Sequence, residues 1–278
     1  MWSHAWAKKF PMQNLIAPFL AQLAHGNAIL VSVQASQGSV PREVGAWMAV
    51  FAYHTLATVG GGRLELDAIA HARALLRTPS LARVQRYALG PSLGQCCGGQ
   101  VTLAFDPVSQ ADVPTLAQRL QTPLMPVALF GSGHVGAALV RALGLLPVDL
   151  SWFDSRDQPF PADTPQRVHC EHSNPVQGAV PGLAPQSRVL VMSFSHAEDL
   201  DIVAACLLRQ RVQGDLPFIG LIGSKTKWAT FSHRLLAKGF SAAELAQVTC
   251  PIGIPGIQDK RPEVIAASVA AQLLLLWA

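Results

Sequence analysis

The sequence predicts an α/β protein in which a mixed α/β domain precedes a doubly wound parallel sheet. Its 278 residues are enough for two domains at roughly 150 residues each. Hydrophobic residues make up 50% of the chain and charged residues only 14%, which is typical of a folded chain with large buried cores. Beyond residue 122, short apolar runs alternate with helical patterns, as they do in a parallel sheet covered on both faces.

In the first domain, the apolar runs ILVSV and AWMAVF flank a loop with Gly and Pro, which predicts two strands in a hairpin-like unit. The turn Gly60-Gly61-Gly62 then precedes residues 63–77, whose apolar side chains recur at helical spacing. The segments ARVQRYALG and VTLAFDPV read as two further strands, joined by the loop GPSLGQCCGGQ. We therefore expect a mixed sheet with at least one helix.

Four prolines between residues 107 and 126 indicate a short linking helix or a domain boundary, which we place near Thr122. The predicted domains are therefore residues 1–122 and 123–278. In the second domain the expected strands are VALF, VDLSWFD, RVLVMSF and FIGLIGS. The expected helices are AALVRALGLL, HAEDLDIVAACLLRQ and KTKWATFSHRLLAKG.

The hexapeptide GSGHVG fits the GxGxxG pattern, with glycines at 131, 133 and 136 and His134 between them, and it stands between a predicted strand and a predicted helix. Gly131 would permit a tight turn, Gly133 would let the backbone approach a phosphate, and Gly136 would let the helix pack close to the strand. The start of the helix would present N–H donors to an anion. This context predicts a Rossmann-like domain, with a nucleotide as one candidate ligand.

Asp154 ends the next predicted strand, where it would accept a hydrogen bond from a ribose hydroxyl. Arg156 would instead meet a second phosphate. In the alternative interpretation the glycines only pack the turn, and Asp154 only caps a loop.

Five cysteines include the adjacent pair Cys96 and Cys97 among four glycines. Soft thiolates suit molybdenum, copper or zinc and can also carry persulfide sulfur, whereas two adjacent thiols are a poor cage for a four-coordinate structural metal. The alternative is that both are small buried apolar residues. For Cys170, Cys206 and Cys250 the sequence favours this structural interpretation.

Ser195 and Glu198 fit a helix N-cap and its capping-box partner, and His196 between them is a candidate ligand or catalytic residue. The turn Gly223-Ser224-Lys225 is open to three interpretations: a general base, a phosphate contact or a surface turn. Neither GxSxG nor HExxH occurs.

Charge and cysteine usage exclude several classes of protein. The net charge is +4, without runs of basic and aromatic residues, so we expect no nucleic-acid partner. The odd number of cysteines, the absence of CxxC and an opening segment unlike a signal peptide predict a reducing, cytoplasmic setting. The uncharged tail at residues 264–278 is shorter than the ~20 residues that span a bilayer, so we expect no membrane anchor.

Seven segments together resemble the XdhC/CoxI family of xanthine dehydrogenase accessory proteins over nearly the whole chain. They are GSVPREVGAWMAV, TVGGGRLE, LGPSLGQCCGGQVTL, VALFGSGHVGAAL, SFSHAEDLD, LIGSKTK and CPIGIPGIQDKRPEVIAASVAAQLL. The resemblance implies a cytoplasmic maturation chaperone, commonly dimeric, that binds the molybdenum cofactor (molybdopterin). It would help a cysteine desulfurase exchange an oxo for a sulfido ligand and deliver the cofactor to apo xanthine dehydrogenase.

Carried over by position, the resemblance implies that Cys96 and Cys97 contact the molybdenum or its sulfur. The other residues that fall in the family's motifs are Arg42, Gly61, Gly62, Glu65, Gly131, Gly133 and Gly136. Arg63 stands where the family pattern has a small or thiol side chain. Holding the cofactor without turning it over needs no catalytic dyad, so no catalytic residue is assigned and an enzyme is not expected. Two alternatives stay open: an NAD(P)-binding oxidoreductase, and a cofactor-free scaffold for dehydrogenase assembly.

Overall fold

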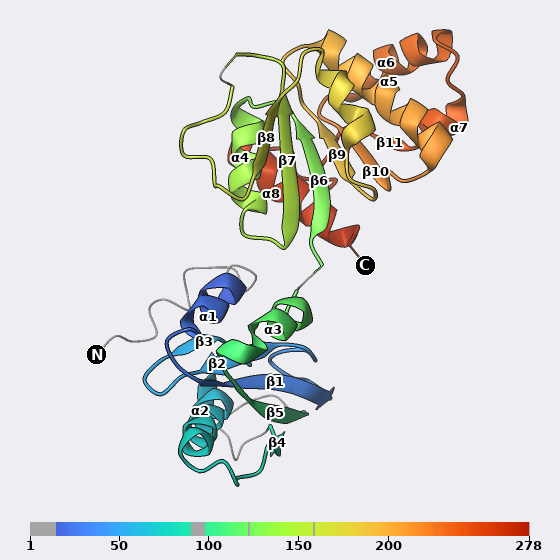
Figure 1. Cartoon of the computed structure of the whole chain (residues 1–278). Helices are drawn as coiled ribbons and strands as arrows, with labels where there is room; N and C mark the ends of the chain where they lie inside the picture. Colours follow the sequence, from blue (N-terminus) through green and yellow to red (C-terminus); the bar gives the residue numbers. More distant parts are fainter. Residues whose placement is uncertain (1–14, 90–97, 122, 158, 278) are drawn as a thin grey trace. The chain divides into compact units, whose positions relative to one another are not determined.

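The computed structural model describes residues 15–89, 98–121, 123–157 and 159–277. Contacts within the chain divide it into two compact units, residues 1–122 and 123–278 (Figure 1). Each unit contains one β-sheet and its own hydrophobic cores, so each is described by itself.

The first unit is built on one five-stranded sheet with the order β3-β2-β1-β5-β4. Its strands are β1 (Ala28–Gln37), β2 (Trp47–Val50), β3 (Thr55–Ala57), β4 (Val84–Ala88) and β5 (Gln100–Val108). Every neighbouring pair is antiparallel. We expected a mixed sheet, with both parallel and antiparallel pairs, and that expectation is wrong for this unit. The reason is that β1, β2 and β3 follow one another as direct neighbours, as do β4 and β5, without a helical crossover between them.

Both faces of this sheet are covered. The helices are α1 (Ile16–Gln22), α2 (Gly62–Arg77), η3 (Gln110–Asp112) and α3 (Val113–Arg119). Side chains alternate along β1, so that Ile29 and Val31 join the core under α2 while Leu30 joins the core under α1 and α3. The predicted helix at residues 63–77 is confirmed as α2, and α3 is the short helix expected before the domain boundary.

The second unit contains the predicted parallel sheet. Its strands are β6 (Met125–Phe130), β7 (Val148–Asp154), β8 (His169–His172), β9 (Arg188–Val191), β10 (Phe218–Leu221) and β11 (Val248–Thr249). Their order is β11-β10-β9-β6-β7-β8, and all pairs are parallel. The doubly wound fold class is therefore confirmed.

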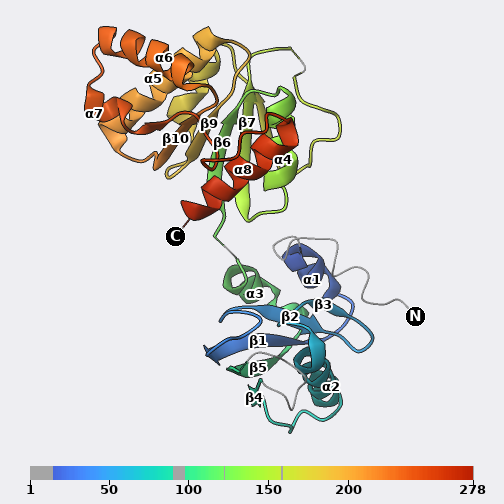
Figure 2. The ribbon, with the colours of Figure 1, turned by 180° about the vertical axis from the view of Figure 1, so that it is seen from behind.

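Helices cover both faces of this sheet. One face is covered by α4 (His134–Leu143) and α8 (Pro262–Leu275), which pack together (Figure 2). The elements on the other face are η4 (Val176–Gly182), α5 (His196–Gln213), α6 (Lys225–Ala237) and α7 (Ala242–Leu245). The apolar tail is thus α8, buried against α4. Among the described residues, no helix is both long enough and apolar enough to cross a bilayer.

The order in which successive strands are added to the sheet reverses between β8 and β9, on the two sides of β6. From β6 it proceeds through β7 to β8, and it then returns to β9 on the other side of β6 and continues outward through β10 to β11. In open α/β sheets, ligands bind outside the carboxyl ends of the strands at such a switch point. The turns that follow β6, β7 and β9 therefore define the place to look for a site.

Candidate functional site at the carboxyl edge of the parallel sheet

The three glycines of the β6–α4 turn have different surroundings. Gly131 has a φ of 110°, and a side chain there would overlap the backbone carbonyl of Met192. A side chain on Gly136 would overlap the carbonyl oxygen of Gly131. At Gly133, by contrast, no atom in the described part of the chain, apart from Gly133 itself and its two chain neighbours, lies within 4 Å of the place that a Cβ would take. Packing therefore explains the first and third glycines, whereas the second borders open space.

The Asp154 carboxylate is 2% exposed and holds this turn in place. Its Oδ2 accepts hydrogen bonds from Ser132 N (2.7 Å), Ser132 Oγ (2.8 Å) and Arg156 Nη2 (2.8 Å), and its Oδ1 accepts from Arg156 N and Nε (both 2.9 Å). Burial alone would raise the pKa of Asp154, but the hydrogen bonds from Arg156 and Ser132 outweigh it and hold the pKa well below its usual range. Asp154 is therefore an ionised residue that fixes the turn.

Arg156 extends along the same turn. Its Nη2 also donates to Ser132 Oγ (2.8 Å), and its guanidinium stands 5.3 Å from the ring centroid of Phe194. The two N–H groups of Nη1 make no hydrogen bond to the described residues. The Asp154 carboxylate neutralises the Arg156 guanidinium, so the site would attract an anion through oriented N–H donors rather than through net charge.

The start of α5 differs from its prediction. Ser195 Oγ accepts from Glu198 N (3.2 Å), which confirms the N-cap. Glu198 does not complete the capping box, because its Oε1 instead accepts from Ser155 Oγ (2.6 Å), in the turn after β7. Its Oε2 is buried and has no partner among the described residues. Glu198 therefore ties the β7 turn to the β9 turn across the switch point.

The two candidate histidines begin helices at this edge. His134 is the first residue of α4 and His196 the first residue of α5, and both side chains are exposed. The His196 ring meets Phe231 edge-on with centroids 6.2 Å apart. Their roles as ligand contacts stay predictions. At the turn Gly223-Ser224-Lys225, Ser224 Oγ accepts from Lys227 N (3.1 Å), so Ser224 acts as the N-cap of α6.

In the first unit, the triple-glycine turn is organised by Glu65. The Glu65 carboxylate accepts hydrogen bonds from the Thr58 hydroxyl and from Gly61 N, the latter at 3.1 Å. Gly61 and Gly62 both have positive φ, of 74° and 62°, which favours glycine. Glu65 therefore stabilises the sharp entry into α2.

Two further predicted motifs lie beside this turn. A Cβ added to Gly60 would lie 2.5 Å from Pro41 Cγ and 3.7 Å from Arg42 Cγ, so the β1–β2 loop packs on the glycines. A Cβ on Gly38 in the same loop would lie 3.2 Å from Gly99 Cα. Arg42 thus belongs to a group of three adjoining loops. Cys96 and Cys97 lie outside the described residues.

Replacing Glu65 tests the structural role of this turn. We expect Glu65→Ala to lower the free energy of unfolding by about 1–2 kcal/mol, because the Gly61 N–H and the Thr58 hydroxyl lose their acceptor. Arg63→Ala is the matched control: it removes an ion pair with Asp67 whose side chains are 65% and 35% exposed, and such pairs contribute only about 0.3–0.5 kcal/mol. Urea denaturation measures both. Equal, small effects would show that Glu65 does not hold the turn.

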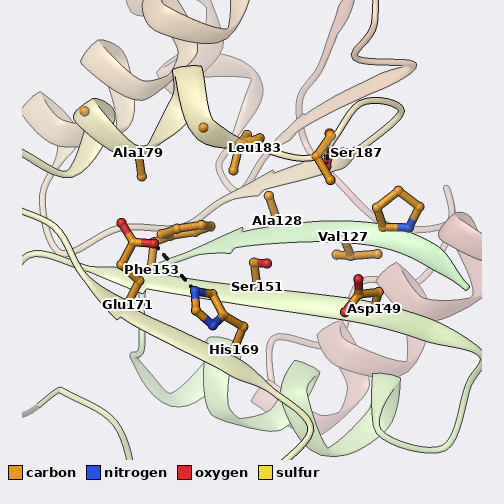
Figure 3. Close-up of a pocket in the computed structure, with 14 residues that line it drawn as sticks. Val127, Ala128, Asp149, Ser151, Phe153, His169, Glu171, Ala179, Leu183 and Ser187 are labelled. Carbon is orange, nitrogen blue, oxygen red and sulfur yellow. Dashed lines mark hydrogen bonds and ion pairs between the residues drawn. The ribbon is translucent and has the colours of Figure 1, made fainter.

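A cavity of about 210 Å³ lies elsewhere, against one face of the sheet, between β6, β7, β8 and η4 (Figure 3). Asp149, Ser151 and His169 face into it, and His169 Nε2 lies 3.7 Å from Glu171 Oε2. None of the predicted site residues lines this cavity. The carboxyl edge remains the candidate site, because that is where the glycine turn, Asp154 and Arg156 meet.

Sequence reasoning missed several residues at this edge. Ser155 and Phe194 follow strands without belonging to a familiar motif, and Asp199 and Lys227 read as ordinary residues of polar helix starts. Asp199 is 2% exposed, and Phe194, a large apolar side chain, is 69% exposed. The only signal available in the sequence was their position directly after predicted parallel strands.

Comparison with protein families gives two matches. A family model described as the XdhC Rossmann domain matches residues 127–273. A model described as the XdhC and CoxI family matches residues 21–88. The loop with Cys96 and Cys97 lies between the two matched ranges.

Individual proteins show the same similarity. The chain is 26% identical over 243 residues to an uncharacterized protein, YqeB, of Escherichia coli (strain K12), in an alignment that covers 86% of this chain and 41% of that protein. The chain therefore spans about two fifths of the length of this relative. A solved structure described as a xanthine dehydrogenase from Bacillus halodurans has a TM-score of 0.78 and 19% identity, and the match covers 94% of this chain and 95% of that chain. That similarity shows a shared fold.

Proposed function

Because the chain belongs to the XdhC and CoxI family, as its motifs indicated, we propose that it is a xanthine dehydrogenase accessory protein that holds the molybdenum cofactor as cargo. In this proposal it keeps the cofactor during sulfuration and delivers it to apo xanthine dehydrogenase. Family membership supports the accessory role. The binding of the cofactor rests on the geometry of the β6–α4 turn.

The observation that carries the proposal is the open space at Gly133. Molybdopterin ends in a phosphate, and a phosphate binds well at a helix start that presents backbone N–H groups. Among the described residues, no side chain caps the first turn of α4, and no atom beyond the chain neighbours of Gly133 fills the space beside it. Arg156 stands beside this turn with Nη1 directed to no described acceptor. These groups would bind the phosphate end of the cargo.

The same geometry bears on a nicotinamide ligand. A dinucleotide needs an acceptor at the end of the second strand for its ribose hydroxyl. Both Asp154 oxygens already accept hydrogen bonds from Ser132 and Arg156. A ribose would have to displace one of these donors. A phosphate needs no such displacement, which favours the phosphate of the cofactor over a dinucleotide.

The resemblance assigns the metal end of the cofactor to the two adjacent cysteines. Cys96 and Cys97 would supply the soft thiolates that suit molybdenum or its sulfur, and Arg42, Gly61, Gly62 and Glu65 fall in the family's two N-terminal motifs. When bound, the cofactor supplies the molybdenum centre that a hydroxylase uses. This chain would contribute binding and shielding only, and no residue is proposed to turn the cofactor over.

The proposal requires two protein partners. One is a cysteine desulfurase, which would supply the sulfur. The other is apo xanthine dehydrogenase, which would receive the sulfurated cofactor. We include in the proposal the homodimer that the family resemblance implies.

Retention of the cofactor on the purified chain tests the proposal. We expect the protein, isolated from cells that make molybdopterin, to release a pterin on denaturation. Gly133→Ala and Arg156→Ala should each lower the pterin content about tenfold, because a lost charge-assisted hydrogen bond or a blocked approach is worth roughly 1.5 kcal/mol. Cys96→Ala and Cys97→Ala should lower it as well. Mass and absorbance spectra of the released molecule measure the content.

Gly182→Ala is a suitable control, since that glycine also borders open space but lies in η4, away from the carboxyl edge. Release of nicotinamide instead of pterin would establish the oxidoreductase alternative. Capture of a dehydrogenase or desulfurase subunit by protein that never contains a small molecule would establish the scaffold alternative. Unchanged pterin content in both cysteine variants would remove the thiols from the site.

A further inference from the structure

The cavity beside η4 has a polar lining that a doubly wound sheet does not require. Helices cover both faces of such a sheet, so its strands are usually apolar on both sides. On β7, Leu150 and Trp152 follow this rule and pack in the core beneath α4 and α8. Asp149 and Ser151 break it on the opposite face, where the connection from β8 to β9 provides only the short helix η4 (Figure 3). The sequence of β7 therefore matches a hollow of about 210 Å³ rather than a packed core.

The strand registers arrange the polar side chains along this hollow. Ser151 pairs with His169, and Phe153 pairs with Glu171. Asp149 and Glu171 stand at opposite ends of the cavity (Figure 3), and the spacing of residues along and across strands puts their Cα atoms roughly 14 Å apart. Metal–oxygen bonds are only about 2–2.6 Å long, so one metal ion would not reach both carboxylates. The arrangement instead suits an elongated ligand with a group of the same kind at each end.

The polar groups of the cavity have unused hydrogen-bonding capacity. The Asp149 carboxylate and the Ser151 hydroxyl make no hydrogen bond or ion pair to the described residues. At the same end as Asp149, Ser187 is 3% exposed, and its Oγ donates to the carbonyl oxygen of Ala184 (2.6 Å) but accepts from none of the described residues (Figure 3). A hydroxyl that donates in this way still has lone pairs to offer. The cavity therefore offers acceptors to a ligand that brings its own donors.

Between the two ends the wall is apolar and buried. None of its side chains is more than 8% exposed at Ala128, Phe153, Ala179 and Leu183. The ionisable groups of the lining are two carboxylates and the imidazole of His169, and within the described ranges it contains neither lysine nor arginine. Such a lining disfavours an anion and favours a ligand with cationic ends and an apolar middle.

The η4 wall is held in place without help from a ligand. Arg209 in α5 is 7% exposed, and its Nη1 donates to the carbonyl oxygen of Val180 in η4 (2.8 Å). The Nε and Nη2 atoms of Arg209 donate to the Asp215 carboxylate at 3.0 and 2.6 Å. This buried ion pair fixes η4 to α5, so the cavity is already formed in the free protein.

We propose that this cavity binds a linear aliphatic polyamine, with its terminal ammonium groups at Asp149 and Glu171 and its methylene chain along the apolar wall. An ammonium group has donors only, which complements the acceptors at both ends. An apolar cavity of about 150 Å³ holds benzene, and the additional volume here suits a thin chain of about ten non-hydrogen atoms. The site is separate from the carboxyl edge, and the proposal does not rest on the proposed function.

Isothermal titration of the full-length chain with spermidine tests the proposal. We expect one spermidine to bind per chain. Putrescine should bind at least tenfold more weakly, because its two ammonium groups are too close together to reach both carboxylates. Asp149→Asn and Glu171→Gln should each weaken spermidine binding about tenfold, since each removes one charge-assisted contact. Ser151→Leu should abolish binding, because the larger side chain fills the middle of the cavity.

Glu263→Gln is the matched control, because Glu263 is an exposed carboxylate of α8, on the other face of the sheet. We expect it to bind spermidine as the unmodified chain does. Non-specific attraction of a polycation would respond alike to the loss of any surface carboxylate, and the net charge of +4 does not favour it.

Four results would overturn the proposal: no binding of spermidine, equal binding of putrescine, unchanged binding in Asp149→Asn, or the same weakening in Glu263→Gln as in Asp149→Asn. Unchanged binding in Ser151→Leu would show that the polyamine lies outside the cavity and would overturn it as well. The titration contains no cofactor, so its failure leaves the proposed function standing, and a failure of the pterin measurement leaves this proposal standing.

Discussion

Gly131→Ala should destabilise the second unit by at least about 3 kcal/mol, the largest effect that we expect from a single methyl group in this chain. Gly131 has a φ of 110°, a conformation that alanine rarely adopts, and its Cβ would overlap the Met192 carbonyl. The overlap involves backbone on both sides. Relief would therefore require β6 and β9 to separate at the centre of the sheet.

Gly133→Ala is the matched control two residues further on. Its φ of −68° suits alanine, and its Cβ would enter open space. We expect the free energy of unfolding to change by about 1 kcal/mol or less, the usual range at an N-cap. Thermal and urea denaturation measure both variants. Similar losses of stability at both positions would contradict the steric explanation for the glycine at position 131.

Asp154→Asn should cost about 2 kcal/mol at neutral pH. The buried carboxylate accepts five hydrogen bonds from Ser132 and Arg156, and an amide nitrogen would face donors instead of accepting from them. The loss is smaller than for a fully buried pair because the Arg156 side chain is 38% exposed and can turn toward water. Asp149→Asn, an exposed position on the same strand, should change stability little.

The same residue predicts a pH dependence. The folded-state pKa of Asp154 is lowered, so its contribution to stability is complete above the unfolded pKa of about 3.9. The contribution is lost as the pH falls from about 4 toward the folded-state pKa. We expect Asp154→Asn to show a shallower loss of stability below pH 4 than the unmodified chain. Urea midpoints of both proteins across this pH range measure the difference. The same loss of stability per pH unit in both proteins would contradict the prediction.

The sequence predicted most of the second unit because its elements have strong local patterns. The runs around Phe130 and Val191 are short and apolar, and α4 and α5 have regular helical spacing. The strand directions of the first sheet were less accessible. They depend on the pairing of β1 with β5, which are far apart in the chain, and no local pattern encodes such a pairing.

The candidate site was only partly predictable. Gly131, Gly133 and Asp154 belong to a pattern with a known physical basis, and the structure brings them together. The partner of Glu198 was not predictable, because Ser155 lies 43 residues away in the chain and the local capping box offered an equally good alternative. Asp199 and Lys227 likewise form their ion pair (2.6 Å) across 28 residues of chain, so no local pattern indicated it.

The parallel sheet ends in very short strands, with four residues in β8 at one side and two residues in β11 at the other. These short edge strands expose few backbone N–H and C=O groups to which an incoming peptide strand could hydrogen-bond. A partner protein that docks on this unit would therefore be recognised through loops and side chains rather than by strand addition. The same short edges leave little template for intermolecular aggregation during synthesis.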